Sequence, residues 1–478
     1  MSFLFSAEAL YFIGFLVIAY EIRKIVLPPS NFPKNIPTIP FYAILVAKYK
    51  GWDQERLFNE YYRDLVEKHG AVKMYHGSMW NILVTKPEYL SQILKSDQIY
   101  EKCGNQIKIP WSIFSQYTGD NVISASMNNW KLYRRVISNS ILFPDLEPLA
   151  KNTQKLCENL KKFTKNFTPV GDILQRYTLA NVGECIVGLD FKTWDDAKHA
   201  PLYNTLKHLK QQLFKPLFLT FPVLDKFPIR SRMKARRSVV EFKNTYMDAL
   251  LAAKRSENGN KLGVRLSEAY EDGRISEKQF QDNAVIALVA GHENPQLLLT
   301  SLVYVLGRNK KLQKDIRKEI TGCGNLSECY LLNSTIIETL RLYPPVAQLI
   351  NRRTSCPTVL GKDILIPKGV YVGYHNLFTQ RDRNYWGPDA DEFEPSRWGS
   401  DTKEVWKNYA TAKSKCTLPA FHGRARACLG EKFALTQART FVSEVLQKYQ
   451  LSLENNNCPL PPAGVVCPVG VSLKVESI

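Results

Sequence analysis

The chain has 478 residues, of which 45% are apolar, and a formal net charge of +19. This length and composition exclude a disordered, fibrous or collagen-like protein and are sufficient for a large buried core. The charge favours an acidic protein, an anionic membrane surface or an anionic cofactor as partner, whereas nucleic acid is not expected, because the basic residues are scattered and no nucleic-acid-binding motif accompanies them.

The first element in the chain is an almost continuous apolar run over residues 3–20, interrupted by the charge of Glu8. Its length is close to the minimum for a membrane-spanning helix. A cleaved signal peptide is the alternative, but basic residues would then precede the run, and here Arg23 and Lys24 follow it. We therefore predict a transmembrane anchor over residues 1–26, with the rest of the chain on the cytosolic side.

A proline-rich segment comes next, "LPPSNFPKNIPTIP", and predicts a stiff, extended spacer over residues 27–41. Residues 42–478 form the predicted main domain. Helical periodicity is clear in that domain at residues 51–70, 146–167 and 230–255. The polar stretch "ENGNKLGVRLSEAYEDGR" predicts a surface connection.

Strand-like patterns are fewer and shorter than the helical ones. They occur in "AVKMYHGSMWNILV", "DILIPKGVYVGY" and "GVSLKV", the last two in the final third of the chain. We therefore expect a mainly α, α+β fold, in which a large helical portion is joined to a smaller sheet portion.

A long apolar helix is predicted between these regions. Ser276 and Gln279 have the spacing of a capping box at its start, and the helix should reach about Gly307. Pro295 lies inside it and cannot bond the carbonyl of Gly291, so we expect a kink that leaves this carbonyl free. A bent core helix without any chemistry is the alternative.

The ten cysteines show no CxxC pair and no regular spacing, which argues against a disulfide framework or a zinc site. Cys428 differs from the others because "FHGRARACLG" places it beside arginines, directly before a predicted helix. Both features stabilise a thiolate. A thiolate next to Gly430, which lets a flat ligand approach closely, is a good axial ligand for haem iron. A buried, inert cysteine is the alternative.

This stretch resembles the haem-binding loop of the cytochrome P450 family, the haem-thiolate monooxygenases. Four residues match the family pattern F-x-x-G-x-R-x-C-x-G, namely Phe421, Arg426, Cys428 and Gly430. The internal glycine of the pattern is replaced by Arg424, with Gly423 one place earlier. We expect the loop to turn differently or to use Gly423 for the turn.

Two further motifs resemble the same family. Glu338 and Arg341 match its E-x-x-R pair, and "FEPSRW" supplies Arg397; in the family these three residues brace the fold behind the haem loop. An ordinary surface ion pair is the alternative for Glu338 and Arg341. Trp130 and Arg134, on one helical face, match the pair that contacts the haem propionates, unless they are a core tryptophan beside a solvated arginine.

The resemblance also assigns Arg426 and Arg352 to the propionates, which need donors at the edge of an apolar ring. In "AGHENP" it implies catalytic roles for Gly291, Glu293 and Asn294. Asn294 replaces the usual threonine and lacks a hydroxyl, so proton delivery is expected to depend on Glu293 and water.

The family resemblance covers nearly the whole chain after the spacer. It implies the P450 fold, haem b (iron protoporphyrin IX) held by the Cys428 thiolate, and a location at the endoplasmic reticulum membrane. The implied electron donor is an NADPH-dependent flavoprotein reductase. Its docking face would be made basic by Arg134, Arg135, Arg424 and Lys432.

Five stretches are closer still to one branch of the family, which makes dityrosine for the yeast spore wall: "NFPKNIPTIPFY", "TGDNVIS", "AGHENPQLL", "IPKGVYVGY" and "RACLGEKFALT". This resemblance implies a role in sporulation, the oxidative carbon–carbon coupling of two N-formyl-tyrosines, and hence a small phenolic substrate. One alternative is a hydroxylase of a fatty acid or another apolar molecule. Another is a haem-binding sensor or carrier without turnover.

Substrate specificity should come from the side of the haem opposite Cys428. We expect it to involve the long helix, the loop "IKIPWSIF", and the residues after Pro345, namely Val346, Gln348 and Leu349. An N-formyl amino acid carries a carboxylate and therefore needs a cation. Lys108 is a candidate, with a solvated loop lysine as the alternative reading.

Overall fold

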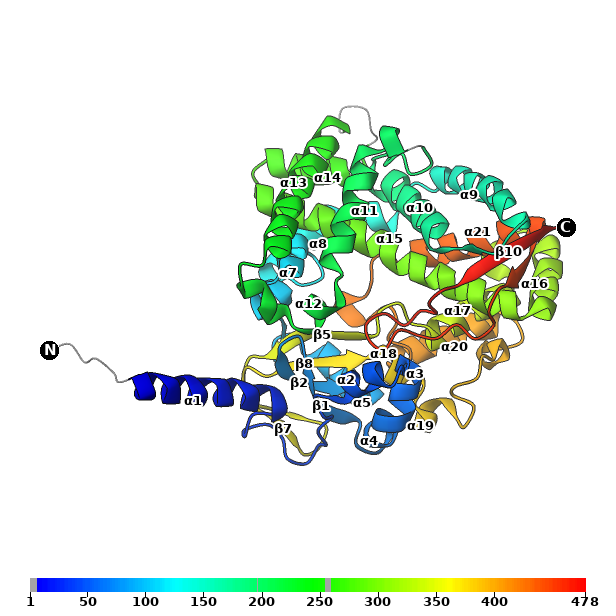
Figure 1. Ribbon diagram of the computed structural model, residues 1–478. Helices are drawn as coiled ribbons and strands as arrows, with labels where there is room; N and C mark the ends of the chain where they lie inside the picture. The colour runs from blue at the N-terminus through cyan, green and yellow to red at the C-terminus, as the bar shows by residue number, and fades with distance from the viewer. Residues whose placement is uncertain (1–6, 196, 254–258) are drawn as a thin grey trace.

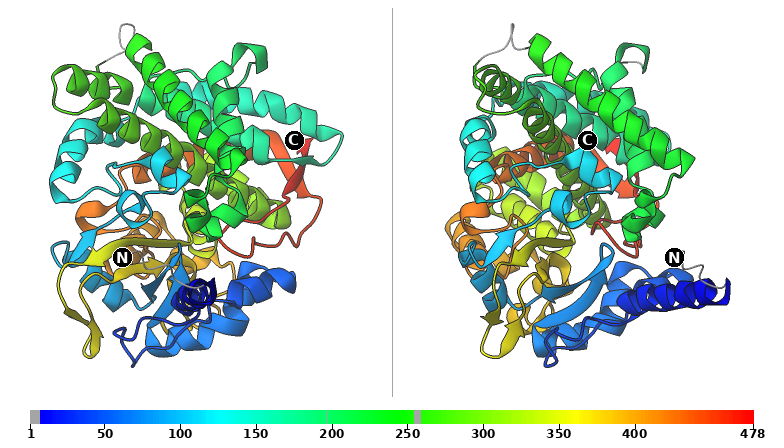
Figure 2. Two further views of the ribbon diagram at one scale, coloured as in Figure 1. Left: turned by 60° about the vertical axis from the view of Figure 1, so that its left-hand side comes forward. Right: turned by 90° about the vertical axis from the view of Figure 1, so that its left-hand side faces the viewer.

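The computed structural model describes residues 7–195, 197–253 and 259–478. It has a large helical part and a smaller part built on a sheet (Figure 1), and the same two parts are seen from two other sides in Figure 2. Helix α1 (Ala7–Val26) projects from the sheet part. The predicted mainly α, α+β architecture is confirmed.

The long helix α15 (Glu277–Arg308) runs through the middle of the helical part. The hydroxyl of Ser276 accepts from the N–H of Gln279, and the side chain of Gln279 accepts from the N–H of Ser276, so the predicted capping box is present. The helix continues through Pro295 as one element. It packs against α7 (Ile113–Thr118), α10 (Gly171–Asn181), α13 (Arg230–Ala253) and α21 (Glu431–Lys448).

The other helices of this part surround α15. They include α8 (Met127–Leu142), α9 (Glu147–Leu160), α11 (Pro201–Leu213), α14 (Leu262–Glu271), α16 (Lys310–Gly322), α17 (Tyr330–Leu342) and α20 (Thr402–Ser414). The helices predicted at 146–167 and 230–255 are confirmed as α9 and α13, except that residues 254–255 lie outside the described ones. The helix predicted at 51–70 is present as α3 (Gln54–Leu57), the π-helix η1 (Phe58–Tyr62) and α4 (Arg63–His69).

The surface connection predicted in "ENGNKLGVRLSEAYEDGR" is wrong, because this stretch contains α14. Its apolar residues Leu262, Leu266 and Ala269 recur at helical spacing and are buried. The helix packs against α8, α13 and α15. The intervening polar residues hid this narrow stripe in the sequence. Glu257 and Asn258, at the start of the stretch, lie outside the described residues.

The main sheet has the strand order β1 (Ala71–His76), β2 (Met79–Val84), β8 (Tyr371–His375), β5 (Gln348–Thr354), β3 (Tyr100–Lys102). β1 and β2 form an antiparallel hairpin, and β8 runs parallel to β2 and antiparallel to β5. β5 contains one extra residue relative to β8 between Leu349 and Arg352. β3 pairs with β5 and places Lys102 opposite Arg352.

Two smaller sheets complete the fold. One has the order β4 (Thr168–Pro169), β10 (Ser472–Ser477), β9 (Tyr449–Leu453), and the other pairs β6 (Thr358–Leu360) with β7 (Ile364–Ile366). The three strand-like patterns are therefore confirmed, as the β1–β2 hairpin, as β7 with β8, and as β10.

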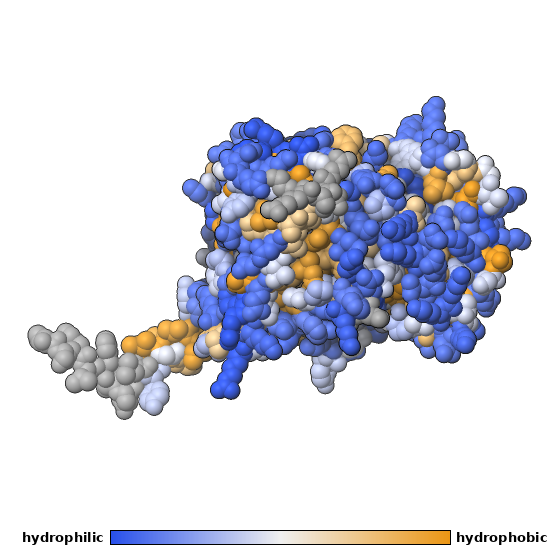
Figure 3. Space-filling view, turned by 90° about the horizontal axis from the view of Figure 1, so that it is seen from above, coloured by the Kyte–Doolittle hydropathy of each residue, from blue (hydrophilic) through white to orange (hydrophobic). Residues whose placement is uncertain are grey.

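The N-terminal residues lie along the sheet part. In the spacer, the carbonyl of Pro37 accepts from the N–H of Lys73 in β1, and the N–H of Ile39 donates to the carbonyl of Lys73. Apolar side chains gather on α1 where it leaves the body (Figure 3). No helix among the described residues, α1 included, has both the length and the apolar character to cross a membrane. The predicted anchor is therefore not confirmed.

Candidate functional site

The loop of residues 421–430 turns tightly ahead of α21. The N–H of Cys428 donates to the carbonyl of Phe421 at 2.9 Å and closes the loop. Arg424 has a φ of 58°, a left-handed conformation that costs a residue other than glycine about 1–2 kcal/mol. Gly423 is extended, so of the two alternatives the structure excludes a turn at Gly423. Arg424 itself adopts the conformation that a glycine holds without strain.

The Cys428 side chain is accessible although it lies among many protein atoms. The residue is exposed, yet the protein atoms around its thiol desolvate it and raise its pKa. The N–H of Gly430 and the charge of Arg134 act in the opposite direction and lower the pKa. An accessible atom in so dense an environment faces internal space, which fits a bound haem. Arg134 and the backbone N–H of Gly430 lower the thiol pKa, as expected, but for the protein atoms alone desolvation outweighs them and the net shift is upward. A metal ion would stabilise the thiolate directly.

Asp97 brings together two of the residues expected at the propionates. Arg352 Nη1 donates to Asp97 Oδ1 at 2.6 Å, and Arg426 Nε donates to Asp97 Oδ2 at 3.2 Å. Burial alone would raise the pKa of Asp97, but the two guanidinium groups together hold it below its ordinary value. In the described part of the chain, Arg352 Nε and Nη2 are buried and have no hydrogen-bond partner. These donors are available to a further anion.

Trp130 and Arg134 project from α8 into the same region. The guanidinium of Arg426 lies 4.1 Å from the centroid of the Trp130 ring, and that of Arg134 lies 5.9 Å from it. Arg134 Nη1 also donates to the carbonyl of Ala427, at 3.3 Å. The structure therefore places both residues beside the Cys428 loop.

Lys102 belongs to this region and was not predicted from the sequence. It is buried, lies opposite Arg352 in the β3–β5 pair, and donates to Asn351 Oδ1 at 3.0 Å. Burial, followed by the charges of Arg352 and Arg426, lowers its pKa well below the ordinary value. Its place beside Arg352 results from the pairing of β3 with β5, which comes from a distant part of the chain, so the local sequence does not indicate it.

His422 is the second residue that was missed. Its Nδ1 lies 2.8 Å from the hydroxyl of Tyr374, and its Nε2 is buried without a partner among the described residues. We call Asp97, Lys102, Arg352, His422 and Arg426 the basic cluster. It contains two arginines and a lysine but one carboxylate. Because a haem carries two propionates, the donors and the charge of this cluster fit its polar edge.

The predicted contact between Glu338, Arg341 and Arg397 is present, and we call these three residues the brace. Glu338 and Arg341 are fully buried, so the alternative of a surface ion pair is wrong. Arg341 donates from Nε and Nη2 to the two oxygens of Glu338 at 2.8 and 2.7 Å, and Arg397 Nε lies 3.5 Å from Glu338 Oε1. Arg341 Nη1 also donates to the carbonyls of Gln380 and Ala390.

The three residues expected to be catalytic lie in the middle of α15. Glu293 Oε1 is 3.2 Å from Lys210 Nζ on α11. Burial raises the pKa of Glu293, while Lys210 opposes this shift. Asn294 is partly buried and makes no side-chain hydrogen bond to the described residues. At Gly291 an added Cβ would lie 2.3 Å from Val182 Cγ2, so the glycine allows α15 to approach η3 (Val182–Val187) closely.

His292, between these residues, was not singled out in the sequence. Its Nδ1 lies 2.6 Å from the carbonyl of Leu288, and its Nε2 lies 3.3 Å from Lys210 Nζ. Burial, together with Lys210, lowers the pKa of His292 to about 3. The imidazole is therefore neutral at physiological pH.

The residues expected to set specificity include a buried cation. Lys108 is only 5% exposed, so the reading as a solvated loop lysine is wrong. Its Nζ donates to Asn81 Oδ1 at 2.7 Å. Val346, Gln348 and Leu349 are partly buried at the start of β5 and just before it.

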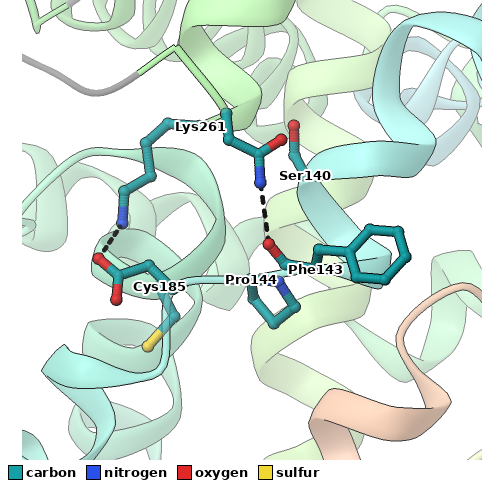
Figure 4. Close-up of a pocket in the computed structure, with 7 residues that line it drawn as sticks. Ser140, Phe143, Pro144, Cys185 and Lys261 are labelled. Carbon is teal, nitrogen blue, oxygen red and sulfur yellow. Dashed lines mark hydrogen bonds and ion pairs between the residues drawn. The ribbon is translucent and has the colours of Figure 1, made fainter.

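A pocket of about 270 Å³ lies elsewhere, between α8, η3 and α14 (Figure 4). Asn260 donates to the carbonyl of Phe143 at 2.9 Å and Lys261 donates to Asp145 Oδ2 at 3.1 Å across it. None of the predicted site residues lines it. It is therefore separate from the candidate site.

Comparison with known proteins supports the family resemblance seen in the sequence. The cytochrome P450 family model matches residues 33–474. The chain is 43% identical to Cytochrome P450-DIT2 of Saccharomyces cerevisiae over 98% of both chains. It is 32% identical to Cytochrome P450 monooxygenase xanG of Aspergillus fumigatus, over 89% of this chain and 84% of that one. It is 25% identical to Cytochrome P450 52A13 of Debaryomyces hansenii, over 73% and 72%.

Proposed function

The chain belongs to the cytochrome P450 family, and from this membership we propose that it couples two N-formyl-tyrosines to bisformyl dityrosine for a spore wall. As a family member it is a haem-thiolate oxidoreductase that uses O2 and electrons from a reductase. The observation that carries the substrate proposal is the likeness to the dityrosine-forming branch. That likeness is supported by 43% identity to the yeast relative over 98% of both chains.

We assign the thiolate of Cys428 as the iron ligand, with Phe421 and Gly430 shaping its loop. Arg352 and Arg426 of the basic cluster, together with Trp130 and Arg134, would hold the propionates through charge-assisted hydrogen bonds. The unpartnered Nε and Nη2 of Arg352 support this assignment. When bound, haem b supplies one-electron oxidation driven by the reduction of O2.

The overall reaction is balanced by two electrons and two protons from the reductase side. Each phenol loses one hydrogen atom, the two rings join through a new carbon–carbon bond, and O2 is reduced to two waters. We assign proton delivery to Glu293, whose raised pKa favours the protonated carboxyl. Asn294 offers an amide donor and acceptor but no hydroxyl. This is compatible with a reaction that transfers no oxygen to the substrate.

We further assign an NADPH-dependent flavoprotein reductase as the electron donor, docking at a basic face. That face would consist of Arg134, Arg135, Arg424 and Lys432. Exposed apolar side chains on α1, such as Tyr11 and Phe15, support attachment of this segment to the endoplasmic reticulum membrane, with the catalytic domain on the cytosolic side.

The test is product analysis with purified protein, reductase, NADPH and N-formyl-tyrosine. We expect a fluorescent product with the mass of two substrates less two hydrogens, formed only when Cys428 is intact. The matched variant Cys428→Ala should lose the product and the carbon monoxide difference spectrum together. A hydroxylated monomer, or no substrate-stimulated NADPH oxidation with any of several phenols, would contradict the proposal.

A further inference from the structure

No carboxylate among the described residues pairs with Lys108. Besides the hydrogen bond to Asn81 Oδ1, its Nζ lies 4.9 Å from the centroid of the Tyr371 ring. The ionisable group that opposes the loss of its charge is Cys103, a thiol. Burying an ammonium group without a counter-ion is strongly unfavourable. Burial accordingly lowers the pKa of Lys108 to about 7.

Two other buried lysines pair with carboxylates, and a third donates to a backbone carbonyl. Lys243 Nζ pairs with Asp282 at 2.5 Å, and Lys261 Nζ pairs with Asp145 at 3.1 Å. Lys73 Nζ, in β1, donates to the carbonyl of Pro33 in the spacer at 2.9 Å. Lys108 differs from Lys243 and Lys261 because its one hydrogen bond within the described chain goes to a side-chain amide oxygen and not to a carboxylate. Lys102 of the basic cluster shares this arrangement, through Asn351 Oδ1, and we have proposed an anionic ligand for that cluster as well.

Asn81 is held rigidly by the β1–β2 hairpin. Its Nδ2 donates to the carbonyls of His76 and Met79 at 2.9 and 2.8 Å, and more weakly to that of Met74 at 3.4 Å. This fixes Oδ1 toward Lys108. One oxygen acceptor cannot satisfy the three N–H donors of an ammonium group. Asn81 therefore holds the Lys108 ammonium group in place, and the remaining N–H donors of this group can bind a ligand.

One side of the ammonium group faces a glycine and not a side chain. Gly77 occupies the hairpin turn, and a Cβ built on it would meet within 4 Å only Nζ and Cε of Lys108, at 3.8 and 3.9 Å. His76 keeps accessible surface although burial, followed by the charge of Lys108, lowers its pKa to about 4. Cys428 also combines accessible surface with a pKa shifted by burial. We infer that this end of the hairpin, like the cysteine loop, borders internal space.

Gln348 adds an unused acceptor to this region. Its Nε2 lies 2.9 Å from His76 Nδ1, and its Oε1 is buried without a hydrogen-bond partner among the described residues. Leaving a buried acceptor unpaired is costly. An occupant that carries both an anion and an N–H donor would satisfy Lys108 and Gln348 together.

We propose that Lys108 binds the carboxylate of the substrate, and that Gln348 Oε1 accepts the N–H of its formamide group. This inference rests on the proposed function and specifies which end of the substrate the protein holds. Formylation removes the charge of the amino group, so an N-formyl amino acid carries a single net negative charge. One buried lysine neutralises it, whereas a free amino acid would bring an uncompensated ammonium group beside Lys108.

A ligand comparison tests this without any mutation. N-formyl-tyrosine and its uncharged amide differ only at the carboxyl group, and their dissociation constants can be measured from the change in the haem absorption spectrum. Because a hydrogen-bonded charge pair is lost, we expect the amide to bind roughly 10–100-fold more weakly. Equal affinities in the wild-type protein would overturn the proposal.

The matching substitution is Lys108→Met, which keeps an unbranched side chain one atom shorter and removes the charge. It should weaken binding of the acid to the level of the amide and leave the affinity for the amide unchanged. Lys73→Met, the same substitution at a buried lysine of the same sheet, should preserve the preference for the acid. A preference that survives in Lys108→Met, or disappears equally in Lys73→Met, would overturn the proposal.

Product analysis separates this proposal from the proposed function. If the preference for the acid depends on Lys108 but no dityrosine forms, the proposed function fails and the carboxylate site stands. If dityrosine forms and Lys108→Met keeps the preference for the acid, the site fails and the proposed function stands. If the wild-type protein neither binds N-formyl-tyrosine nor forms product, both are overturned.

Discussion

The brace and the basic cluster both concentrate buried charge, but they differ in what remains unpaired. In the brace, Glu338 accepts from Arg341, from the indole of Trp398 and from the N–H of Glu394. One nitrogen of the brace, Arg397 Nε, makes no hydrogen bond to the described residues, but it lies 3.5 Å from the Glu338 carboxylate. In the basic cluster, Arg352 keeps two buried nitrogens and His422 one without a partner among the described residues. A charge cluster satisfied by its own chain stabilises the fold, whereas one with unused donors is suited to a ligand. Lys108, with one acceptor for its three N–H groups, is likewise suited to a ligand.

The largest effect that this comparison predicts is on the brace. Glu338→Gln leaves Arg341 as an uncompensated buried charge and should lower the free energy of unfolding by about 3–5 kcal/mol. Denaturant unfolding measures this. The control is Glu444→Gln, which breaks an exposed pair with Lys448 and should change stability by less than about 0.5 kcal/mol. Similar losses in the two variants would show that the brace is not a structural unit.

A substitution in the basic cluster should reduce stability less than one in the brace and should mainly reduce haem binding. Arg352→Met removes Nε and Nη2, which no described residue uses, so retention of haem should fall markedly. It also removes the Nη1 hydrogen bonds to Asp97 and to the carbonyl of Tyr100. The free energy of unfolding of the haem-free protein should fall by only about 1–2 kcal/mol. The measurements are haem absorbance per protein and denaturant unfolding. Normal haem content with a loss of stability as large as that of Glu338→Gln would remove the distinction between the two clusters.

The smallest effect concerns pH. The pKa of Asp97 in the folded protein is below the ordinary value of 3.8, so its pairing with Arg352 and Arg426 stabilises the fold above that pH. This contribution is lost as the pH falls through the folded-state pKa. Asp97→Asn should therefore be less stable than wild type at neutral pH, and the difference should narrow in acid. Thermal unfolding over this pH range measures it, and a constant difference would contradict the assignment.

The sequence predicts best those features whose cause is local. The capping box depends on two residues three places apart, Ser276 and Gln279, and α15 begins where it predicts. The contact of Glu338 with Arg341 is also local, since both lie on α17. The stripe of α14 is local as well, but it is narrow, and its polar neighbours led to the wrong prediction of a surface connection.

The sequence fails where burial depends on distant pairing. Lys102 and Lys108 are six places apart and look like solvated loop residues. Their burial is produced by β5 and by the β1–β2 hairpin, from other parts of the chain. Likewise, the pattern of the cysteine loop does not reveal that Arg424 tolerates a left-handed backbone, because sequence spacing carries no φ value. The net shift in the pKa of Cys428 cannot be predicted from the sequence for a similar reason, since desolvation depends on the whole surrounding fold.

The extra residue in β5 has an evolutionary consequence. Gln348 lies before it, toward the hairpin, and Arg352 lies after it, in the basic cluster. An irregularity of this kind absorbs small changes in strand length without shifting the pairing beyond it. A change of strand length near Gln348, which we propose contacts the substrate, can therefore leave Arg352, which we propose holds a haem propionate, in the same register. A single strand can thus combine a segment that tolerates insertion with one whose pairing is fixed.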